Sequence, residues 1–394
     1  MSSCATADLY PLWGNEMQGS FVVLIGANQL KQEGALHMLS YTDVWEIVNR
    51  WHIQMRVTRL RNLALLVYGI IRSRSGCLSV IVRHWPHGPR RHTHRLKRLH
   101  RFLKNSGVKE APVFESLAGI IWSYRPGGKR TQLFPVALDW TKVHAFSALF
   151  AAMPRKSRAL PLAFGTYHPT RLRHSQNKLE RGMCTLVASL LPKDATPLFL
   201  ADAGFGRTEF IRWLQKQGFA YVVRLRPDTL VHYRGRTCPL GEFDTIEGAP
   251  IILSNVQYRE KKPVTVHIVI SRLGDSVWYL GTSFHEAKQA VAWYKKRFWI
   301  EEMFRDLKST LGLRKAQLKD EERLTRLLLG YQIAYLILSL IGLQVPKRWH
   351  TYFSSRPSLS VIWLALHALE LCLKPRHRKV WRRHIWPALW LKTG

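Results

Sequence analysis

The feature that most constrains the fold of this sequence is a succession of apolar segments between residues 132 and 227. Three short runs rich in Val, Leu, Phe and Ala have the length and composition of buried strands: "LFPVALDW", "AFSALFAAMP" and "ALPLAFGTYH". The chain then alternates helical segments with further strand candidates, in the order "QNKLERGMCTLVASLLP", "TPLFLADAGFG", "TEFIRWLQKQG" and "AYVVRLRP". The predicted order is therefore β-β-β-α-β-α-β, which requires a mixed α/β sheet with helices packed on its faces.

This order is similar to that of a ribonuclease-H-like core, in which a hairpin meander feeds a pair of parallel strands. Residues 228–283 interrupt the pattern with the strand-like runs "PIILSNVQY", "VTVHIVISR" and "SVWYLGTS". We therefore predict a catalytic core formed by residues 131–227 and 284–345, with a β-rich insertion at residues 228–283 between its two parts.

The charge of the chain points to a polyanionic partner. Lys and Arg number 60 against 26 Asp and Glu, a formal net charge of +34, and a field of that sign attracts nucleic acid. No acidic residue lies between Glu46 and Glu110, and the apolar spacing of residues 41–130 predicts a small helical module. Like charges on such helices repel unless a polyanion balances them, so we predict that this module binds DNA; a solvated basic surface is the alternative.

The termini and the cysteines give weaker expectations. We expect residues 1–40 to form a loosely ordered extension, with Met17 or Met38 as alternative starts. Residues 346–394 are basic with interleaved Trp, which suits a DNA or partner surface as well as a packed terminal helix. The scattered cysteines lack Cys-x-x-Cys spacing and predict a reducing cytosol, with no zinc ribbon and no disulfide framework: Cys4, Cys77, Cys184, Cys238 and Cys372.

One segment is long and apolar enough to raise the question of a membrane. Residues 327–345, "LLLGYQIAYLILSLIGLQV", are nearly free of charge and about as long as a membrane span. Gln332 and Ser339 interrupt the segment, and both flanks are basic. We predict a buried core helix there, and we expect no secretory signal at the start of the sequence.

The segment "WYKKRFWIEEMFRDLK", residues 293–308, is predicted to be one helix with a charged stripe beside an apolar stripe. At about 100° per residue, Glu302 and Asp306 lie well away from these stripes, and Glu301 lies at the edge of the core. The charged stripe contains Tyr294, Arg297, Glu301 and Lys308. An exposed Arg297–Glu301 pair is the alternative explanation, and such a pair stabilises a helix by only roughly 0.3 kcal/mol.

Two further acids change the interpretation of Glu301. Asp139 is predicted to end the first strand and Asp202 the fourth, and neighbouring strands would present both carboxylates at one end of the sheet. A helix that returns after the insertion can bring Glu301 to them. Three crowded carboxylates repel one another, and a divalent cation relieves that repulsion. We therefore predict a site for Mg²⁺ or Mn²⁺, with two ions roughly 3.5 to 4 Å apart.

These residues resemble the DDE transposases of bacterial insertion sequences that carry the Y-R-E-K signature. The resemblance spans residues 40–345 and rests on Asp139 and Asp202 together with Tyr294-x2-Arg297-x3-Glu301-x6-Lys308. It implies that Asp139, Asp202 and Glu301 are the catalytic metal ligands. It also implies that the Tyr, Arg and Lys of the signature bind phosphates near the cleaved DNA end.

Two more DNA contacts follow from the same resemblance. Trp278 occupies the position of a Trp that stacks on a flipped base in the family, although a strand aromatic packed on the core is an equal alternative. The family often has Arg directly after the second Asp, whereas this chain has Ala203 there and Arg207 four residues later. Either Arg207 replaces the contact made by that family arginine, or this chain lacks the contact.

The resemblance implies a cut-and-paste transposase. The helical module would bind the terminal inverted repeats, and the core would cleave both strands through a hairpin and join the 3′ ends to target DNA. Because two DNA ends must be brought together, the resemblance also implies a homodimer. The protein would act at the nucleoid in the bacterial cytoplasm, and no membrane partner is expected. The alternatives are a ribonuclease-H-like structure-specific nuclease and an inactive DNA-binding protein derived from a transposase.

Overall fold

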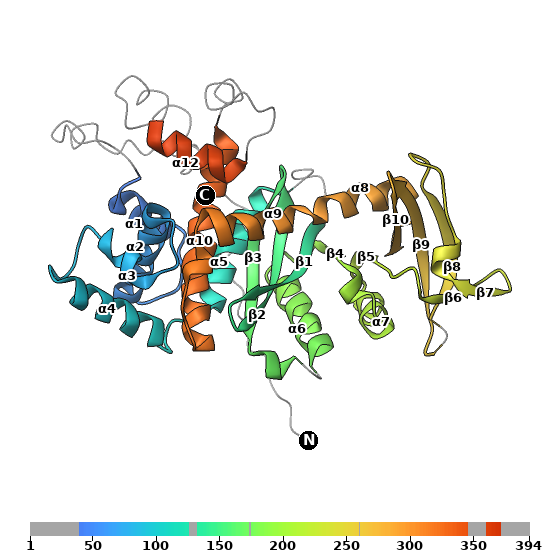
Figure 1. The fold of residues 1–394 in the computed structure, drawn as a ribbon, viewed down its shortest axis with the longest axis horizontal. Coiled ribbons are helices and arrows are strands. Elements are labelled where there is room, and N and C mark those ends of the chain that lie inside the picture. Colours follow the sequence, from blue (N-terminus) through green and yellow to red (C-terminus); the bar gives the residue numbers. More distant parts are fainter. Residues whose placement is uncertain (1–38, 126–131, 173–174, 260, 346–359, 372–394) are drawn as a thin grey trace. The chain divides into compact units, whose positions relative to one another are not determined.

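The computed structural model describes residues 39–125, 132–172, 175–259, 261–345 and 360–371 (Figure 1). The expected extension at residues 1–40 and its alternative starts, Met17 and Met38, lie almost entirely outside the described residues. The same holds for most of the predicted C-terminal region, residues 346–394, of which only residues 360–371 are described.

The N-terminal part of the described chain is helical, as the sequence predicts. Ser40 caps the first helix, because its hydroxyl accepts the Asp43 N–H at 3.1 Å while the Asp43 carboxylate accepts the Ser40 N–H at 2.6 Å. The apolar faces of these helices are buried in the hydrophobic core that also contains the sheet. The helices are α1 (Tyr41–Arg50), α2 (Val57–Ser73), α3 (Leu78–Arg83), α4 (His92–Lys104) and α5 (Ala111–Ser123).

The predicted order β-β-β-α-β-α-β is confirmed. Strand β1 pairs antiparallel with β2 and parallel with β4, which in turn pairs parallel with β5. Strand β3 completes the meander beside β2. The elements are β1 (Leu133–Val143), β2 (Phe146–Arg155), β3 (Arg158–Tyr167), α6 (Gln176–Ser189), β4 (Thr196–Ala201), α7 (Thr208–Lys216) and β5 (Ala220–Arg224).

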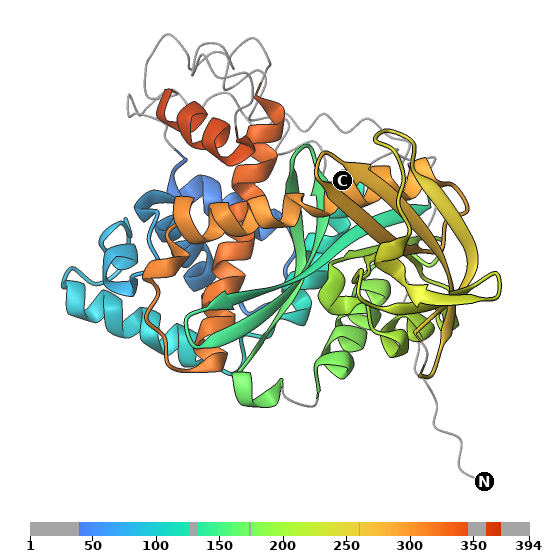
Figure 2. The same cartoon turned by 45° about the vertical axis from the view of Figure 1, so that its right-hand side comes forward.

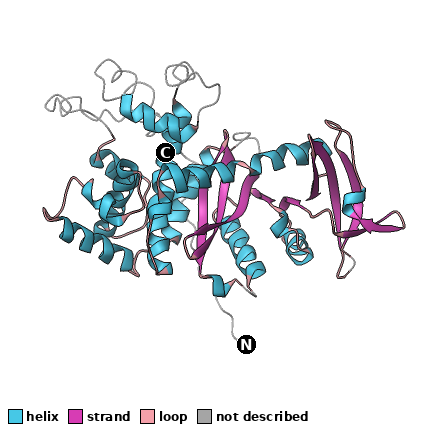
Figure 3. Ribbon diagram, viewed as in Figure 1, coloured by secondary structure: helices cyan, strands magenta, loops and turns pink. Residues whose placement is uncertain are grey.

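The β-rich insertion continues the same sheet. Strand β10 pairs antiparallel with β5, with Leu280 opposite Arg224, so the edge of β5 is covered by the insertion. Figure 3 shows the strands of this ten-stranded sheet, whose order is β3-β2-β1-β4-β5-β10-β9-β8-β6-β7. The inserted strands are β6 (Leu230–Tyr233), β7 (Arg236–Pro239), β8 (Ile251–Tyr258), β9 (Val264–Leu273) and β10 (Ser276–Thr282).

Side chains alternate between the two faces of the central strands. Leu198, Leu200 and Val222 pack against a helix that follows the insertion, α8 (Ala287–Arg297). Phe199 lies on the opposite face, in the cluster that contains residues of α6 and α7. The two faces therefore carry different helices, as the period of two along a strand requires.

The predicted helix at residues 293–308 is interrupted. Helix α8 ends at Arg297, and α9 (Trp299–Arg305) starts after Phe298. Figure 2 shows these helices in orange beside the green strands of the sheet. A π-helical turn, η6 (Asp306–Thr310), and a short 3-10 helix, η7 (Leu313–Lys315), follow. Side-chain directions taken from one regular helix therefore do not hold beyond Arg305, since a π turn changes the rotation per residue.

The apolar segment at residues 327–345 is a core helix, as predicted. It belongs to α10 (Glu321–Gln344), whose most apolar stretch is 89% buried, although α10 is long and apolar enough to cross a membrane. Helix α10 packs against α2, β3 and α12 (Val361–Leu371). Short 3-10 helices complete the described fold: η3 (Pro169–Arg171), η4 (Ala203–Phe205) and η5 (Leu240–Glu242).

Candidate active site

Asp139 and Asp202 lie side by side at the point where two parallel strands separate. The parallel pairing of β1 and β4 ends with Leu138 opposite Ala201, so the next residue of each strand is one of the two aspartates. Asp139 does not end its strand, as the sequence suggested, because β1 continues to Val143 through its pairing with β2. The two carboxylates are therefore held by the backbone of adjacent strands.

Asp202 is fixed by the turn that follows β4. Its Oδ1 atom accepts the backbone N–H of Gly204 at 3.0 Å and so caps η4. This contact orients the Asp202 carboxylate at the start of the turn.

Arg297 connects the sheet to the acid of the following helix. Its Nη1 donates to Oδ2 of Asp139 at 3.2 Å, and its Nη2 donates to Oε1 of Glu301. The Arg297 side chain is only 6% exposed, whereas that of Glu301 is 47% exposed. The i,i+4 pair expected on a solvated helix is thus present, but its arginine is buried and shared with a strand aspartate.

The pKa of Asp139 reflects this environment. Burial raises it from the ordinary value of 3.8 to about 6, the Arg297 charge opposes the shift, and the nearby Asp202 and Glu301 charges add to it. The three acids predicted from the sequence therefore interact electrostatically in the folded chain. A carboxyl group with a pKa raised by burial and by neighbouring acids is typical of a functional site.

The donor set suits a hard divalent cation, but Arg297 supplies the positive charge in this arrangement. Carboxylate oxygens are the ligands that Mg²⁺ and Mn²⁺ prefer. Within the described ranges, no three His, Cys, Asp or Glu side chains are close enough together to hold a metal ion. Binding by Asp139, Asp202 and Glu301 would therefore require the Arg297 guanidinium to move from between Asp139 and Glu301.

Tyr294 is fully buried, with 0% exposure. Its ring packs edge-on against Trp278 at 5.1 Å and Phe298 at 5.9 Å between centroids. Burial raises the pKa of its hydroxyl, and the Arg297 charge opposes that shift. A phosphate contact by Tyr294 would require this aromatic cluster to open.

Trp278 is half-buried in β10 and stacks on Phe298, with centroids 5.6 Å apart and an interplanar angle of 30°. This packing matches the core-aromatic alternative weighed for Trp278. Stacking on a flipped base remains a prediction.

Arg207 binds a buried acid that the sequence interpretation overlooked. Its guanidinium contacts the carboxylate of Glu180, and its Nε donates to Oδ1 of Asn177 at 2.6 Å. Glu180 is 0% exposed and also accepts from Nε1 of Trp140 at 2.9 Å. Because Trp140 directly follows Asp139, this network braces the strand that carries the acid. Glu180 shares its helix face with buried Met183, and that placement was the available sequence signal.

The expectation that Asp306 lies away from the core is wrong. Asp306 is 5% exposed, and its Oδ2 accepts Nε of Arg158 at 2.7 Å. The interruption at Phe298 and the π-helical turn η6 bring this carboxylate to β3, where Arg158 supplies the compensating charge. Glu302 contacts the same arginine at 3.5 Å.

Lys308 lies in η6 and is half-buried. Burial lowers its pKa, the Arg314 charge lowers it further, and the Asp139 charge raises it. Lys308 is therefore within electrostatic reach of the acid on β1, although it lies beyond the end of α9.

The mixed sheet, its covering helices and the strand-borne acids define an α/β domain consistent with the ribonuclease-H-like class. Residues 170–337 match the sequence profile of the family described as transposase DDE domain, which supports a DDE transposase. The matched range includes Asp202 and Glu301 and begins after β3, so Asp139 lies outside it. No curated protein matches the chain.

The match supports an enzyme of the nuclease or transposase type whose substrate is DNA. Transposases of this family generally use divalent metal ions. The chemistry of the three acids agrees with that requirement.

Proposed function

We propose that the protein is a cut-and-paste transposase of a bacterial insertion sequence, with the Y-R-E-K signature at Tyr294, Arg297, Glu301 and Lys308. The observation that carries the proposal is the contact of one buried arginine with both Asp139 and Glu301, beside the strand end that bears Asp202. Such a cluster of acids between a sheet and a helix is suited to phosphoryl transfer.

Asp139, Asp202 and Glu301 are proposed to hold two Mg²⁺ or Mn²⁺ ions. Such ions, when bound, activate an attacking oxygen and stabilise the leaving oxygen of a phosphodiester. The protein's own contribution is to fix Asp139 and Asp202 on neighbouring strands, and Glu301 on a helix packed against the sheet. Arg297 keeps the acids together before substrate arrives and is then free to contact a phosphate.

The remaining predicted DNA contacts take different roles. Lys308 is proposed to contact a backbone phosphate near the cleaved end, and Trp278 to stack on a flipped base. Tyr294 is proposed to hold Arg297 in position, since the Arg297 guanidinium carbon lies over its ring, 5.9 Å from the ring centre. Arg207 is proposed to act through the buried Glu180 network, because its guanidinium is already engaged there.

The helical part of the chain is proposed to bind the terminal inverted repeats. Helix α4 buries Leu99 and Leu103 while it exposes Lys97, Arg101 and Lys104. An exposed basic face on a helix anchored by its apolar residues suits contact with DNA phosphates. Cleavage of both strands through a hairpin, transfer of the 3′ ends to target DNA and assembly of a homodimer on two ends complete the proposal. The protein would act on nucleoid DNA in the cytoplasm.

Cleavage of the element's own ends tests this function. The purified protein is incubated with Mg²⁺ and a duplex made from the ends that flank its gene, and products are resolved on a denaturing gel. We expect end-specific cleavage by the wild type and none by Glu301→Ala. The matched control is Glu302→Ala, since Glu302 lies next to Glu301 but pairs with Arg158 and Arg305.

The alternatives give different results in the same assay. Cleavage that depends on DNA structure and ignores the end sequence would identify a structure-specific nuclease. Binding without cleavage by every variant would identify an inactive DNA-binding relic of a transposase.

A further inference from the structure

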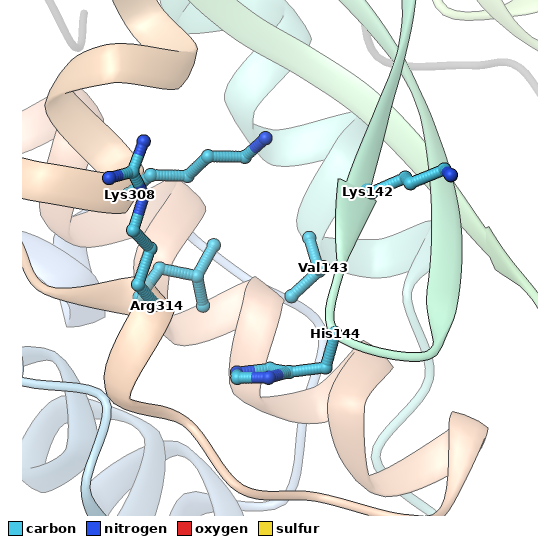
Figure 4. A pocket seen from close by; sticks show the side chains of 6 residues that line it. Lys142, Val143, His144, Lys308 and Arg314 are labelled. Carbon is cyan, nitrogen blue, oxygen red and sulfur yellow. The ribbon is translucent and has the colours of Figure 1, made fainter.

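A basic pocket lies between the β1–β2 turn and the segment after α9 (Figure 4). Its volume is about 180 Å³, several times the roughly 30 Å³ that one water occupies in the liquid. The lining contains basic and apolar side chains and no carboxylate: Lys142, Val143, His144, Lys308, Leu313 and Arg314. Lys308 alone among them was singled out from the sequence.

The basic side chains come from two segments that are distant in the sequence. Lys142 and His144 belong to the end of β1 and its turn, whereas Lys308 and Arg314 belong to η6 and η7. In Figure 4, the side chains of Lys308, Arg314 and His144 surround the space between these two segments. The pocket therefore depends on tertiary structure and on no local motif.

The backbone holds both walls in place. His144 adopts a φ of +53°, in the left-handed region that a tight turn requires. Gly312 adopts a φ of +71°, and its carbonyl accepts the N–H of Gly76 at 2.9 Å. A Cβ atom at Gly312 would lie 2.3 Å from the carbonyl oxygen of Arg74. The turn that presents Arg314 is thus locked against the end of α2, so the pocket is preformed.

The positive charges of the pocket are not matched by acids. Among the residues that the structure describes, no ion pair within 4.0 Å involves any of the four basic side chains of the pocket: Lys142, His144, Lys308 and Arg314. The Arg314 charge disfavours protonation of Lys308, which shows that the two cations repel. A bound anion would relieve this repulsion and accept several charge-assisted hydrogen bonds.

We propose that this pocket binds a DNA backbone phosphate near the one that is cleaved, which makes His144 and Arg314 substrate-positioning residues. The proposal rests on the function proposed above. Val143, which lines the pocket, follows Asp139 by four residues and lies on the same face of β1, about 13 Å further along the strand. A phosphate at that distance belongs to a neighbouring nucleotide, and holding it would fix the register of the DNA strand over the acids.

The test measures DNA binding without cleavage, with Ca²⁺ in place of Mg²⁺ and the same end duplex. Arg314→Gln and His144→Asn are compared with two controls: Lys315→Gln, which lies outside the pocket, and Lys142→Gln, whose side chain points away from it (Figure 4). Thermal melts verify that each variant folds. We expect Arg314→Gln to weaken binding about tenfold and to reduce the salt dependence of log K by about one unit.

A second duplex set carries a single neutral methylphosphonate at successive positions around the cleaved bond. One position should weaken binding by the wild type yet have no further effect on Arg314→Gln, because the variant has already lost that contact. If Arg314→Gln and His144→Asn bind no more weakly than their controls, the pocket proposal is wrong.

The two proposals fail in different ways. Pocket-dependent binding by a wild-type protein that never cleaves would sustain the pocket and overturn the cut-and-paste activity. Cleavage and affinity that are both unchanged in the two pocket variants would overturn the pocket proposal and sustain the cut-and-paste activity. A wild type that fails to bind the duplex would overturn both.

Discussion

Arg297 is the residue that holds the candidate active site together. It is buried, it contacts a strand aspartate and a helix glutamate, and it occupies the centre of a group of acids. A buried arginine between carboxylates is stable only while both signs of charge are present, because desolvation penalises each charge by itself.

Replacing Arg297 with Gln should therefore destabilise the protein by about 3 kcal/mol, since Asp139 would remain buried without its compensating charge. The matched control is Arg305→Gln, whose side chain is 69% exposed and pairs with Glu302. Urea unfolding in EDTA measures both. Equal losses in the two variants would contradict a central role for the buried pair.

Asp139 should make stability depend on pH. Its folded pKa of about 6 lies above its ordinary value of 3.8, so the folded state binds a proton more tightly than the unfolded state. The stabilisation of the folded state by the proton on Asp139 is therefore complete below about pH 4 and is lost as the pH rises through 6. In EDTA, the wild type should lose up to about 3 kcal/mol over this window relative to Asp139→Asn. Parallel pH profiles for the two proteins, measured by urea unfolding, would refute the raised pKa.

At the scale of elements, the segment after α9 decides which charged side chains meet the sheet. The π-helical turn η6 buries Asp306 against Arg158 and carries Lys308, and η7 carries Arg314 to the same pocket. This path requires Gly312, whose positive φ and close approach to Arg74 leave no room for a side chain.

Gly312→Ala should lower the free energy of unfolding by about 2 kcal/mol more than Gly274→Ala. Both glycines have positive φ values, +71° and +55°, but only a Cβ at Gly312 would meet other atoms within 4 Å. The comparison separates steric clash from backbone strain. Similar losses in chemical denaturation would show that the turn relaxes away from α2.

At the scale of the whole molecule, α10 joins the helical part of the chain to the sheet. It packs against α2 on one side and β3 on another, and Gly330 allows the approach to α2. A Cβ at Gly330 would lie 2.7 Å from Cγ of Leu66, which is itself fully buried.

Gly330→Ala should therefore destabilise the protein by about 1 to 2 kcal/mol, despite the higher helix propensity of alanine. Gly119→Ala provides a control of opposite sign: Gly119 is exposed in α5 with nothing within 4 Å of its Cβ position. That variant should gain about 0.5 to 1 kcal/mol. Calorimetric melting compares the two, and a stabilised Gly330→Ala would show that α2 and α10 are not tightly packed.

The sequence by itself determined the order of strands and helices, the core position of α10, and the acids Asp139, Asp202 and Glu301 as candidates. These properties depend on the local period of apolar residues and on residue type, which one segment carries alone. Tertiary structure alone decided that Arg297 bridges Asp139 and Glu301, that Arg207 pairs with Glu180, and that the insertion extends the sheet. Those outcomes depend on which distant segments become neighbours, because a buried charge is stable only beside the partner that the fold brings to it.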